Sequence, residues 1–95
     1  MNPLTNPAII KHIMERHGIV FNKKFGQIFL IADSVLTDII DYSGVTKDDC
    51  VLEIGPGIGA LTVHLATASK KVVSVEIDNG LIPVLDETLA EHDNT

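Results

Sequence analysis

The sequence predicts an α/β fold in which two parallel strands are joined by a helix and flanked by further helices. Two short apolar runs, residues 50–54 and 71–77, have the length and the β-branched content of buried strands. The segment between them begins with a glycine-rich turn and continues with apolar residues at helical spacing. A strand, a helix and a second strand in this order predict a parallel pair with a right-handed crossover, which is the beginning of an open α/β sheet.

The N-terminal block is expected to contribute two helices before the first strand. Asn6 followed by a proline is a favourable helix start, and apolar residues recur at helical spacing over residues 7–17. Residues 19–31 are irregular and predict a structured loop. Asp33 is the predicted N-cap of a second helix that ends at Gly44. The apolar face of this helix is expected to comprise Val35, Leu36, Ile39 and Ile40.

The remaining elements complete the predicted α/β unit. Cys50 leads the first strand and is expected to be a small core residue. Asp78 is the predicted cap of a third main helix. Its inward side chains are expected to be Leu81, Ile82, Leu85 and Leu89. Two parallel strands are fewer than the roughly five or six of an average sheet, so the chain is expected to be the N-terminal part of a truncated sheet.

Composition excludes several classes of protein. The chain has 95 residues, of which 45% are hydrophobic and 21% charged, so it is too apolar for a disordered tail. No apolar stretch approaches the roughly 18 to 20 residues of a membrane-spanning helix, and residues 1–5 do not resemble a secretory signal. We therefore expect a cytoplasmic protein without a membrane partner. The single cysteine and four scattered histidines form no metal-binding pattern, so no metal is expected.

The net charge of −6 conceals an uneven distribution. Residues 1–30 carry four basic side chains and one acidic side chain, whereas residues 31–95 carry three basic and twelve acidic ones. Affinity for nucleic-acid phosphates comes mostly from Lys and Arg, so the N-terminal block is the segment suited to contact nucleic acid. A small acidic domain that begins with a few lysines is the alternative interpretation.

A loop with three glycines, residues 55–59, follows the first predicted strand and opens the next helix. Glycines let the backbone turn tightly and approach a ligand without an intervening Cβ. Glu76 ends the second predicted strand, where a carboxylate can accept hydrogen bonds from both hydroxyls of a ribose that lies across the two strand ends. The loop and the acid together predict a mononucleoside-binding site.

The residues alone leave two candidates for the bound nucleotide-like ligand. Gly55, Gly57 and Ala60 also satisfy the dinucleotide fingerprint, so a dinucleotide-binding oxidoreductase is an alternative. Glu53 favours S-adenosylmethionine, because its carboxylate would repel a pyrophosphate but can orient the loop and face the positive methionine moiety. Pro56, which stiffens the turn, and the long block before the first strand favour the same ligand.

Three segments resemble the opening third of the bacterial small-subunit rRNA adenine N6,N6-dimethyltransferases: KKFGQIFL at 23–30, VLEIGPGIGALT at 51–62 and VEID at 75–78. The resemblance implies a Rossmann-like S-adenosylmethionine-dependent methyltransferase fold. Residues 1–20 would form an N-terminal helical extension, and residues 21–95 the first, cofactor-binding part of the domain. It also implies transfer of two methyl groups to N6 of each of two adjacent adenines in 16S rRNA. The implied partner is the immature small ribosomal subunit, and the full-length enzyme is expected to be a monomer.

The resemblance also assigns roles to individual residues. The positions expected to bind the methyl donor are Gln27, Ile28, Leu30, Glu53, Gly55, Gly57, Gly59 and Glu76. Ile28 stands where the family has Asn and therefore lacks a side-chain hydrogen bond. Lys23 and Lys24 are expected to contact RNA phosphates, with a solvated pair as the alternative.

The adenine-binding segment of this family, an Asn-Leu-Pro-Tyr type motif on the fourth strand, has no counterpart in these 95 residues. Asn2 and Asn6 precede prolines, but no aromatic residue follows either pair, so both are interpreted as turn or helix starts. No catalytic residue is predicted, and the isolated chain is not expected to catalyse. A fragment that binds nucleoside or RNA without turnover is the alternative from another functional class.

Overall fold

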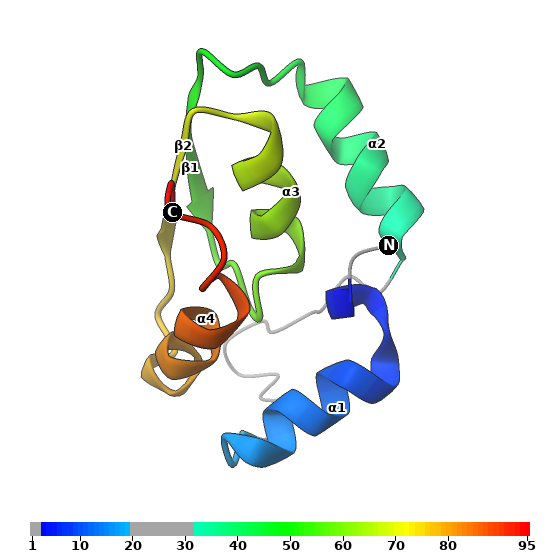
Figure 1. The fold of residues 1–95 in the computed structure, drawn as a ribbon, viewed down its shortest axis with the longest axis vertical. Helices are drawn as coiled ribbons and strands as arrows, with labels where there is room; N and C mark the ends of the chain where they lie inside the picture. The colour runs from blue at the N-terminus through cyan, green and yellow to red at the C-terminus, as the bar shows by residue number, and fades with distance from the viewer. Residues whose placement is uncertain (1–2, 20–31) are drawn as a thin grey trace.

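A computed structural model of the chain describes residues 3–19 and 32–95 (Figure 1). Within these residues, a short 3-10 helix and two α-helices precede the sheet, and each strand is followed by a helix. In chain order the elements are η1 (Pro3–Thr5), α1 (Pro7–Arg16), α2 (Asp33–Ser43), β1 (Cys50–Ile54), α3 (Ala60–Ala68), β2 (Lys71–Val75), η3 (Asn79–Leu81) and α4 (Ile82–Thr88). The predictions for residues 20–31 lie outside the described residues. They concern Lys23, Lys24, Gln27, Ile28 and Leu30.

The predicted first helix is confirmed as α1. Asn6 is its N-cap, and the Asn6 side-chain oxygen accepts a hydrogen bond from the Ala8 N–H at 2.9 Å. The helix ends at Arg16, one residue before the predicted end. Ile10 and Ile13 are buried, so one stripe of α1 faces the rest of the molecule.

The second helix is confirmed, but two of its details differ from the prediction. Ala32 occupies the N-cap position, and Asp33 is the first residue of α2. The Asp33 carboxylate lies 2.9 Å from Nε2 of His64 on α3, so it joins two helices instead of capping its own. Val35 and Ile39 are exposed, because the inward stripe of α2 is narrower than the predicted face. Leu36 is fully buried.

The two strands form a parallel pair, as predicted. Cys50 pairs with Lys71 at one end, and Ile54 pairs with Val75 at the other. The second strand is two residues shorter than the predicted run of 71–77. It ends at Val75, and the carboxylate of the next residue, Glu76, accepts a hydrogen bond from the N–H of Asp78. The carboxyl ends of β1 and β2 therefore lie side by side.

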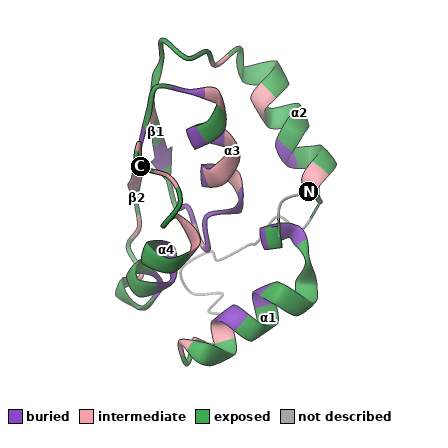
Figure 2. Cartoon of the chain, in the orientation of Figure 1, coloured by how far each residue is buried: buried purple, intermediate pink, exposed green. Residues whose placement is uncertain are grey.

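The sheet has one covered and one uncovered face within the described residues. Figure 1 shows α3 against one face, and the side chains on that side alternate with those on the other. Leu52, Ile54, Val73 and Val75 on the uncovered face, and Ile77 just after β2, are large apolar residues that are 47–70% exposed. Exposed segments are green in Figure 2. Cys50 is exposed as well, so its prediction as a core residue is wrong. The error follows from the missing cover on this face, since a strand residue is buried only when the face to which it points is packed.

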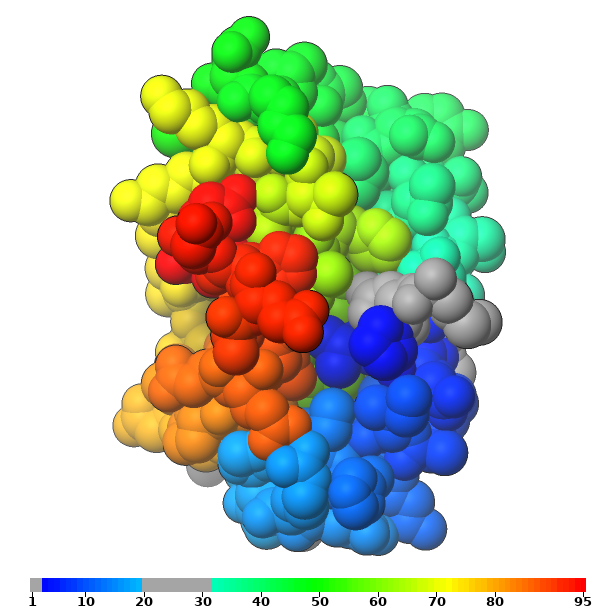
Figure 3. All heavy atoms as spheres, in the orientation of Figure 1, coloured from blue at the N-terminus to red at the C-terminus, as the bar shows by residue number. Residues whose placement is uncertain are grey.

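The core has two parts. A larger cluster joins α1 to the region between β1 and α4 and contains Leu4, Ile10, Ile13, Leu36, Ile58, Ala60, Leu81 and Val84. A smaller one packs α3 onto the sheet through Leu65, Ala66 and Val72. In the space-filling view the blue atoms of α1 lie against the orange atoms of α4 (Figure 3). Within the described ranges, no helix is both long and apolar enough to cross a membrane.

The last predicted helix is divided into two parts. Asp78 caps the short helix η3, because its Oδ1 atom accepts a hydrogen bond from the Gly80 N–H at 2.9 Å, and α4 begins only at Ile82. Pro83 lies in the first turn of α4, where its missing N–H costs no hydrogen bond. Ile82 is 43% exposed, so its predicted inward position is wrong, while Leu81 and Leu85 are buried as expected.

Candidate functional site

The glycine loop, residues 55–59, connects the end of β1 to the start of α3. Gly59 has φ of +95°, and Gly55 has φ of +73°. A Cβ on Gly55 would meet no heavy atom within 4 Å, so the backbone there borders open space that a ligand can enter. The helix α3 starts directly after the loop, and a helix N-terminus favours negatively charged groups.

Gly59 is constrained by contact as well as by its backbone angle. A Cβ at this position would lie 3.1 Å from Oγ1 of Thr88 and 3.2 Å from Cδ2 of Leu89. We expect Gly59→Ala to lower the free energy of unfolding by about 1–3 kcal/mol, because it adds left-handed strain to a steric clash. Gly44→Ala is the matched control, because Gly44 has φ of +70° but open space at the Cβ position. Equal decreases in the free energy of unfolding for the two variants, measured by urea denaturation, would contradict the proposed clash.

Glu76 stands beside the loop, as the sequence predicts. Its Oε1 atom accepts a hydrogen bond from the Gly57 N–H at 3.1 Å, and its Oε2 atom accepts one from the Asp78 N–H at 3.0 Å. A carboxylate oxygen can accept more than one hydrogen bond, so both oxygens keep acceptor capacity for hydroxyl groups. The structure thus brings the glycine loop and the carboxylate together at adjacent ends of two parallel strands.

Glu53 lies beneath the loop and is only 8% exposed. One of its oxygens, Oε1, accepts hydrogen bonds from the hydroxyls of Thr62 on α3 at 2.5 Å and Ser74 on β2 at 2.9 Å. A buried carboxylate requires such donors, because burial without them is costly. Glu53 therefore connects β1, β2 and α3, which is consistent with its predicted part in orienting the loop.

Thr62 and Ser74 are site residues that the sequence analysis missed. A signal for them was present, because Ser74 interrupts a run of valines and Thr62 lies between apolar residues in the first turn of α3. A polar residue on the buried side of a strand or helix indicates a buried polar partner. Glu53 and Ser74 are also direct neighbours in the strand register.

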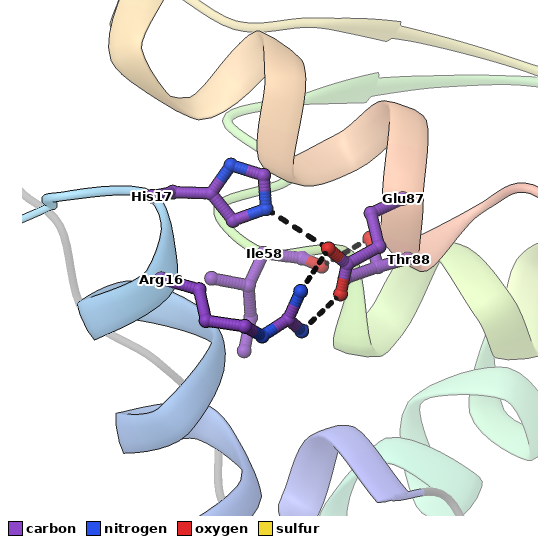
Figure 4. A network of polar contacts seen from close by, with 5 residues as sticks. All are labelled: Arg16, His17, Ile58, Glu87 and Thr88. Atoms are coloured by element: carbon purple, nitrogen blue, oxygen red, sulfur yellow. Dashed lines mark hydrogen bonds and ion pairs between the residues drawn. The ribbon is translucent and has the colours of Figure 1, made fainter.

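A second polar network, which the sequence did not predict, lies on the α4 side of the loop (Figure 4). Arg16 donates hydrogen bonds to both carboxylate oxygens of Glu87, at 2.7 and 2.5 Å. His17 Nε2 lies 3.0 Å from Oε1 of the same carboxylate. The hydrogen bonds from Arg16, followed by that from His17, lower the pKa of Glu87 to about 2. The adjacent Thr88 donates its hydroxyl hydrogen to the Ile58 carbonyl oxygen at 2.8 Å.

The lowered pKa of Glu87 predicts a loss of stability in acid. A carboxyl group whose folded-state pKa is depressed stabilises the fold above its usual pKa of 4.5, and this contribution is lost as the pH falls towards about 2. The Arg16 and Glu87 side chains are 46% and 37% exposed, so solvent screening keeps the effect small. We expect the melting temperature of the unmodified chain to fall more steeply below about pH 5 than that of Glu87→Gln. Parallel curves for the two proteins would contradict this expectation.

The histidines of the described residues do not assemble a metal site. His17 and His64 each lie against a carboxylate, and no group of three potential metal ligands is present in residues 3–19 and 32–95. Of the residues predicted to bind the methyl donor, the structure places Glu53, Gly55, Gly57, Gly59 and Glu76 in or next to the glycine loop. The expected contributions of Gln27, Ile28 and Leu30 lie outside the described residues, as do those of Lys23 and Lys24.

Comparison with known proteins supports the resemblance seen in the sequence. The profile of the family described as ribosomal RNA adenine dimethylase matches residues 18–95. The ribosomal RNA small subunit methyltransferase A of Alkaliphilus metalliredigens is 47% identical over 94 residues, covering 99% of this chain and 33% of that protein. Its namesake from Bacillus cytotoxicus is 50% identical over 99% of this chain and 32% of that protein. The chain therefore spans about a third of the length of these relatives.

Solved structures of similar proteins agree with the architecture. The 23S rRNA methyltransferase ErmE has a TM-score of 0.61 and 39% identity, over 64% of this chain and 25% of that protein. A dimethyladenosine transferase from Plasmodium falciparum has a TM-score of 0.60 and 35% identity, over 64% of this chain and 23% of that protein. The prediction of the N-terminal part of a Rossmann-like methyltransferase fold is thus confirmed. The chain belongs to the ribosomal RNA adenine dimethylase family.

Proposed function

We propose that this chain forms the cofactor-binding part of an enzyme that dimethylates adenines of small-subunit rRNA, with S-adenosylmethionine as the methyl donor. The observation that supports it most is the hydrogen bond from the Gly57 N–H to the Glu76 carboxylate. It joins the glycine loop to an acidic acceptor at the adjacent ends of β1 and β2, where a nucleoside can lie across both strands.

The residues of the site fit the donor in three ways. Glu76 is suited to accept hydrogen bonds from the two ribose hydroxyls, because each of its oxygens accepts one backbone N–H at the strand end and can accept another donor. Gly55 borders open space, so the ligand can approach the backbone. The N-terminus of α3 favours the carboxylate of the methionine moiety. When bound, the donor supplies a methyl group on a positively charged sulfur, which an adenine nitrogen can accept.

The substrate proposal rests on the named relatives, since two of them are ribosomal RNA small subunit methyltransferases. We infer that the target is 16S rRNA in the immature small subunit, with two methyl groups added to N6 of each of two adjacent adenines. Lys23 and Lys24 are proposed to contact its phosphates, and Gln27, Ile28 and Leu30 to line the methionine side of the donor. Such an enzyme would act in the cytoplasm, as a monomer when full length.

The division of the chain follows the same proposal. Residues 1–20 are proposed to be an N-terminal helical extension, and residues 21–95 the first part of the methyltransferase domain. A second candidate function concerns the 95 residues by themselves. Because they contain the glycine loop and Glu76 but no Asn-Leu-Pro-Tyr type motif, they are proposed to bind nucleoside without turnover. Methyl transfer to rRNA by the isolated chain would contradict that second candidate.

The proposed methyl donor is tested against the dinucleotide alternative by thermal shift. We expect S-adenosylhomocysteine, the product of the donor, to raise the melting temperature of the chain with a dose dependence that saturates, because ligands that bind only the folded state stabilise it. NADH at the same concentrations should leave the melting temperature unchanged. Stabilisation by NADH without stabilisation by S-adenosylhomocysteine would overturn the proposal.

Position 28 offers a gain-of-function test of the same site. Ile28 stands where the family has asparagine and is proposed to line the donor, so Ile28→Asn would restore the amide of the family at this position. We expect the variant to bind S-adenosylhomocysteine about tenfold more tightly, as one recovered hydrogen bond is worth roughly 1–3 kcal/mol when a partner would otherwise be left unpaired. Isothermal titration of both proteins measures this difference. Ile28→Leu is the control, and an equal gain in that variant would exclude the hydrogen bond as the cause.

A further inference from the structure

The network of Figure 4 connects the N-terminal helix to the glycine loop through two consecutive residues of α4. Glu87 receives the two hydrogen bonds of Arg16 and lies within 3.0 Å of His17, both at the C-terminal end of α1. The next residue, Thr88, donates to the carbonyl oxygen of Ile58 in the loop. Glu87 therefore fixes α4 to α1, and Thr88 fixes α4 to the loop.

The loop also packs tightly against this end of α4. Ile58 is only 1% exposed and belongs to the same hydrophobic cluster as Ile10 and Ile13 of α1. The Cβ position of Gly59 is 3.1 Å from Oγ1 of Thr88, so no side chain separates the loop backbone from α4. A displacement of Thr88 would consequently shift the backbone of the loop.

Two side chains thus hold two consecutive residues of the loop. Glu76 accepts the hydrogen bond of the Gly57 N–H, and Thr88 donates to the Ile58 carbonyl. The held groups are the Gly57 N–H and the Ile58 carbonyl. Gly57 and Gly59, which flank Ile58, have φ of +62° and +95°. Glu76 belongs to the proposed binding site, whereas Thr88 has no place in it. A substitution of Thr88 should therefore change the conformation of the loop without removing a group that contacts the ligand.

We propose that Thr88, supported by the contact of Glu87 with Arg16 and His17, is a positioning residue that keeps the glycine loop in its ligand-accepting conformation. This inference rests on the proposed function, because the ligand is the one proposed above. A loop that is already ordered loses less conformational entropy on binding, so its fixation increases affinity. The N-terminal helix then influences ligand binding through α4.

The test compares substitutions that remove or keep the hydroxyl. Thr88→Val removes the hydroxyl at nearly constant shape, Thr88→Ser keeps it, and Glu87→Gln removes the charge that pairs with Arg16. Two matched controls lie elsewhere in the fold. Thr67 donates to the Val63 carbonyl on the exposed side of α3, so Thr67→Val removes a similar bond. Glu15 pairs with Lys11 at the surface, so Glu15→Gln removes a similar charge.

Two quantities are measured on the full 95-residue chain: the Kd for S-adenosylhomocysteine, and the exchange rate of the Gly59 amide hydrogen without ligand. The Gly59 N–H donates to the Pro56 carbonyl across the loop at 3.0 Å, so its exchange reports opening of the loop. We expect Thr88→Val to raise both the Kd and the exchange rate about two- to tenfold, as for one lost hydrogen bond. Glu87→Gln should raise both by a smaller factor. Thr88→Ser and both controls should stay within about twofold of the unmodified chain.

A purely structural role would give a different result. Thr88→Val would then lower the melting temperature and leave both the Kd and the Gly59 exchange rate unchanged, and this outcome would overturn the inference. Failure of Thr88→Ser to preserve the unmodified values would overturn it too. If the unmodified chain does not bind S-adenosylhomocysteine, the proposed function fails for this chain. The exchange measurement still decides the inference, because faster Gly59 exchange in Thr88→Val alone supports it and an unchanged rate contradicts it.

Discussion

Replacement of Glu76 by alanine is expected to weaken binding of S-adenosylhomocysteine at least about tenfold, measured by isothermal titration. In the proposed function the carboxylate accepts hydrogen bonds from two ribose hydroxyls, and hydrogen bonds to a charged group are each worth roughly 1.5–3 kcal/mol. The same substitution removes the acceptor of the Gly57 N–H, so part of the loss would come through the loop. Glu76→Gln retains one acceptor oxygen and should lose less affinity than Glu76→Ala.

The control for this prediction is Glu91→Ala, because Glu91 is an exposed acidic residue that lies after α4. Its Kd should equal that of the unmodified chain, which separates a local effect from a change in net charge. A Glu76→Ala variant that remains folded and binds with unchanged affinity would show that the carboxylate does not hold the nucleoside.

Replacement of Glu53 by alanine is expected to lower the free energy of unfolding by about 2–4 kcal/mol. The substitution leaves the hydroxyls of Thr62 and Ser74 without their acceptor in a buried place, and it also removes packed atoms. Urea denaturation measures the loss. Because this carboxylate lies beneath the loop, its removal should also broaden or shift the amide signals of residues 55–59.

Two further variants separate the hydrogen bonds from the packing. Glu53→Gln keeps the volume and one acceptor oxygen, so it should cost less than Glu53→Ala. Ser74→Ala removes only one donor and should cost about 1 kcal/mol. If Glu53→Ala and Ser74→Ala were equally stable, the carboxylate would not be the centre of this network.

The first strand and its glycine loop could be predicted from the sequence because their signals are local. The apolar run of residues 50–54 matches β1 at both ends, and the glycines that follow it adopt positive φ angles. The helix starting at Pro7 was predictable for the same reason, since Asn6 and the proline act on adjacent residues. The proximity of the glycine loop to Glu76 followed from topology, because the carboxyl ends of neighbouring parallel strands lie at the same edge of the sheet.

The features that the sequence did not predict depend on contacts between distant segments. Arg16 and Glu87 are 71 positions apart, and no local pattern pairs them. Asp33 is of a residue type that often caps helices. Its carboxylate instead lies 2.9 Å from Nε2 of His64, and Ala32 occupies the N-cap position. Cys50 was predicted to lie in the core because it begins an apolar strand. Its burial would require elements packed on the uncovered face of the sheet, and none of the described residues packs there.

The most direct test of the account is an amide chemical-shift titration of the ¹⁵N-labelled chain with S-adenosylhomocysteine. The account predicts saturable shifts at Gly55, Gly57, Gly59 and Glu76, with a single Kd shared by all four. Amides near the C-terminal end of α2, such as Tyr42, should not move, because this end lies away from the loop (Figure 1). A well-dispersed spectrum in which the loop and Glu76 signals stay unchanged at saturating ligand would contradict the assignment of this edge of the sheet as the donor site.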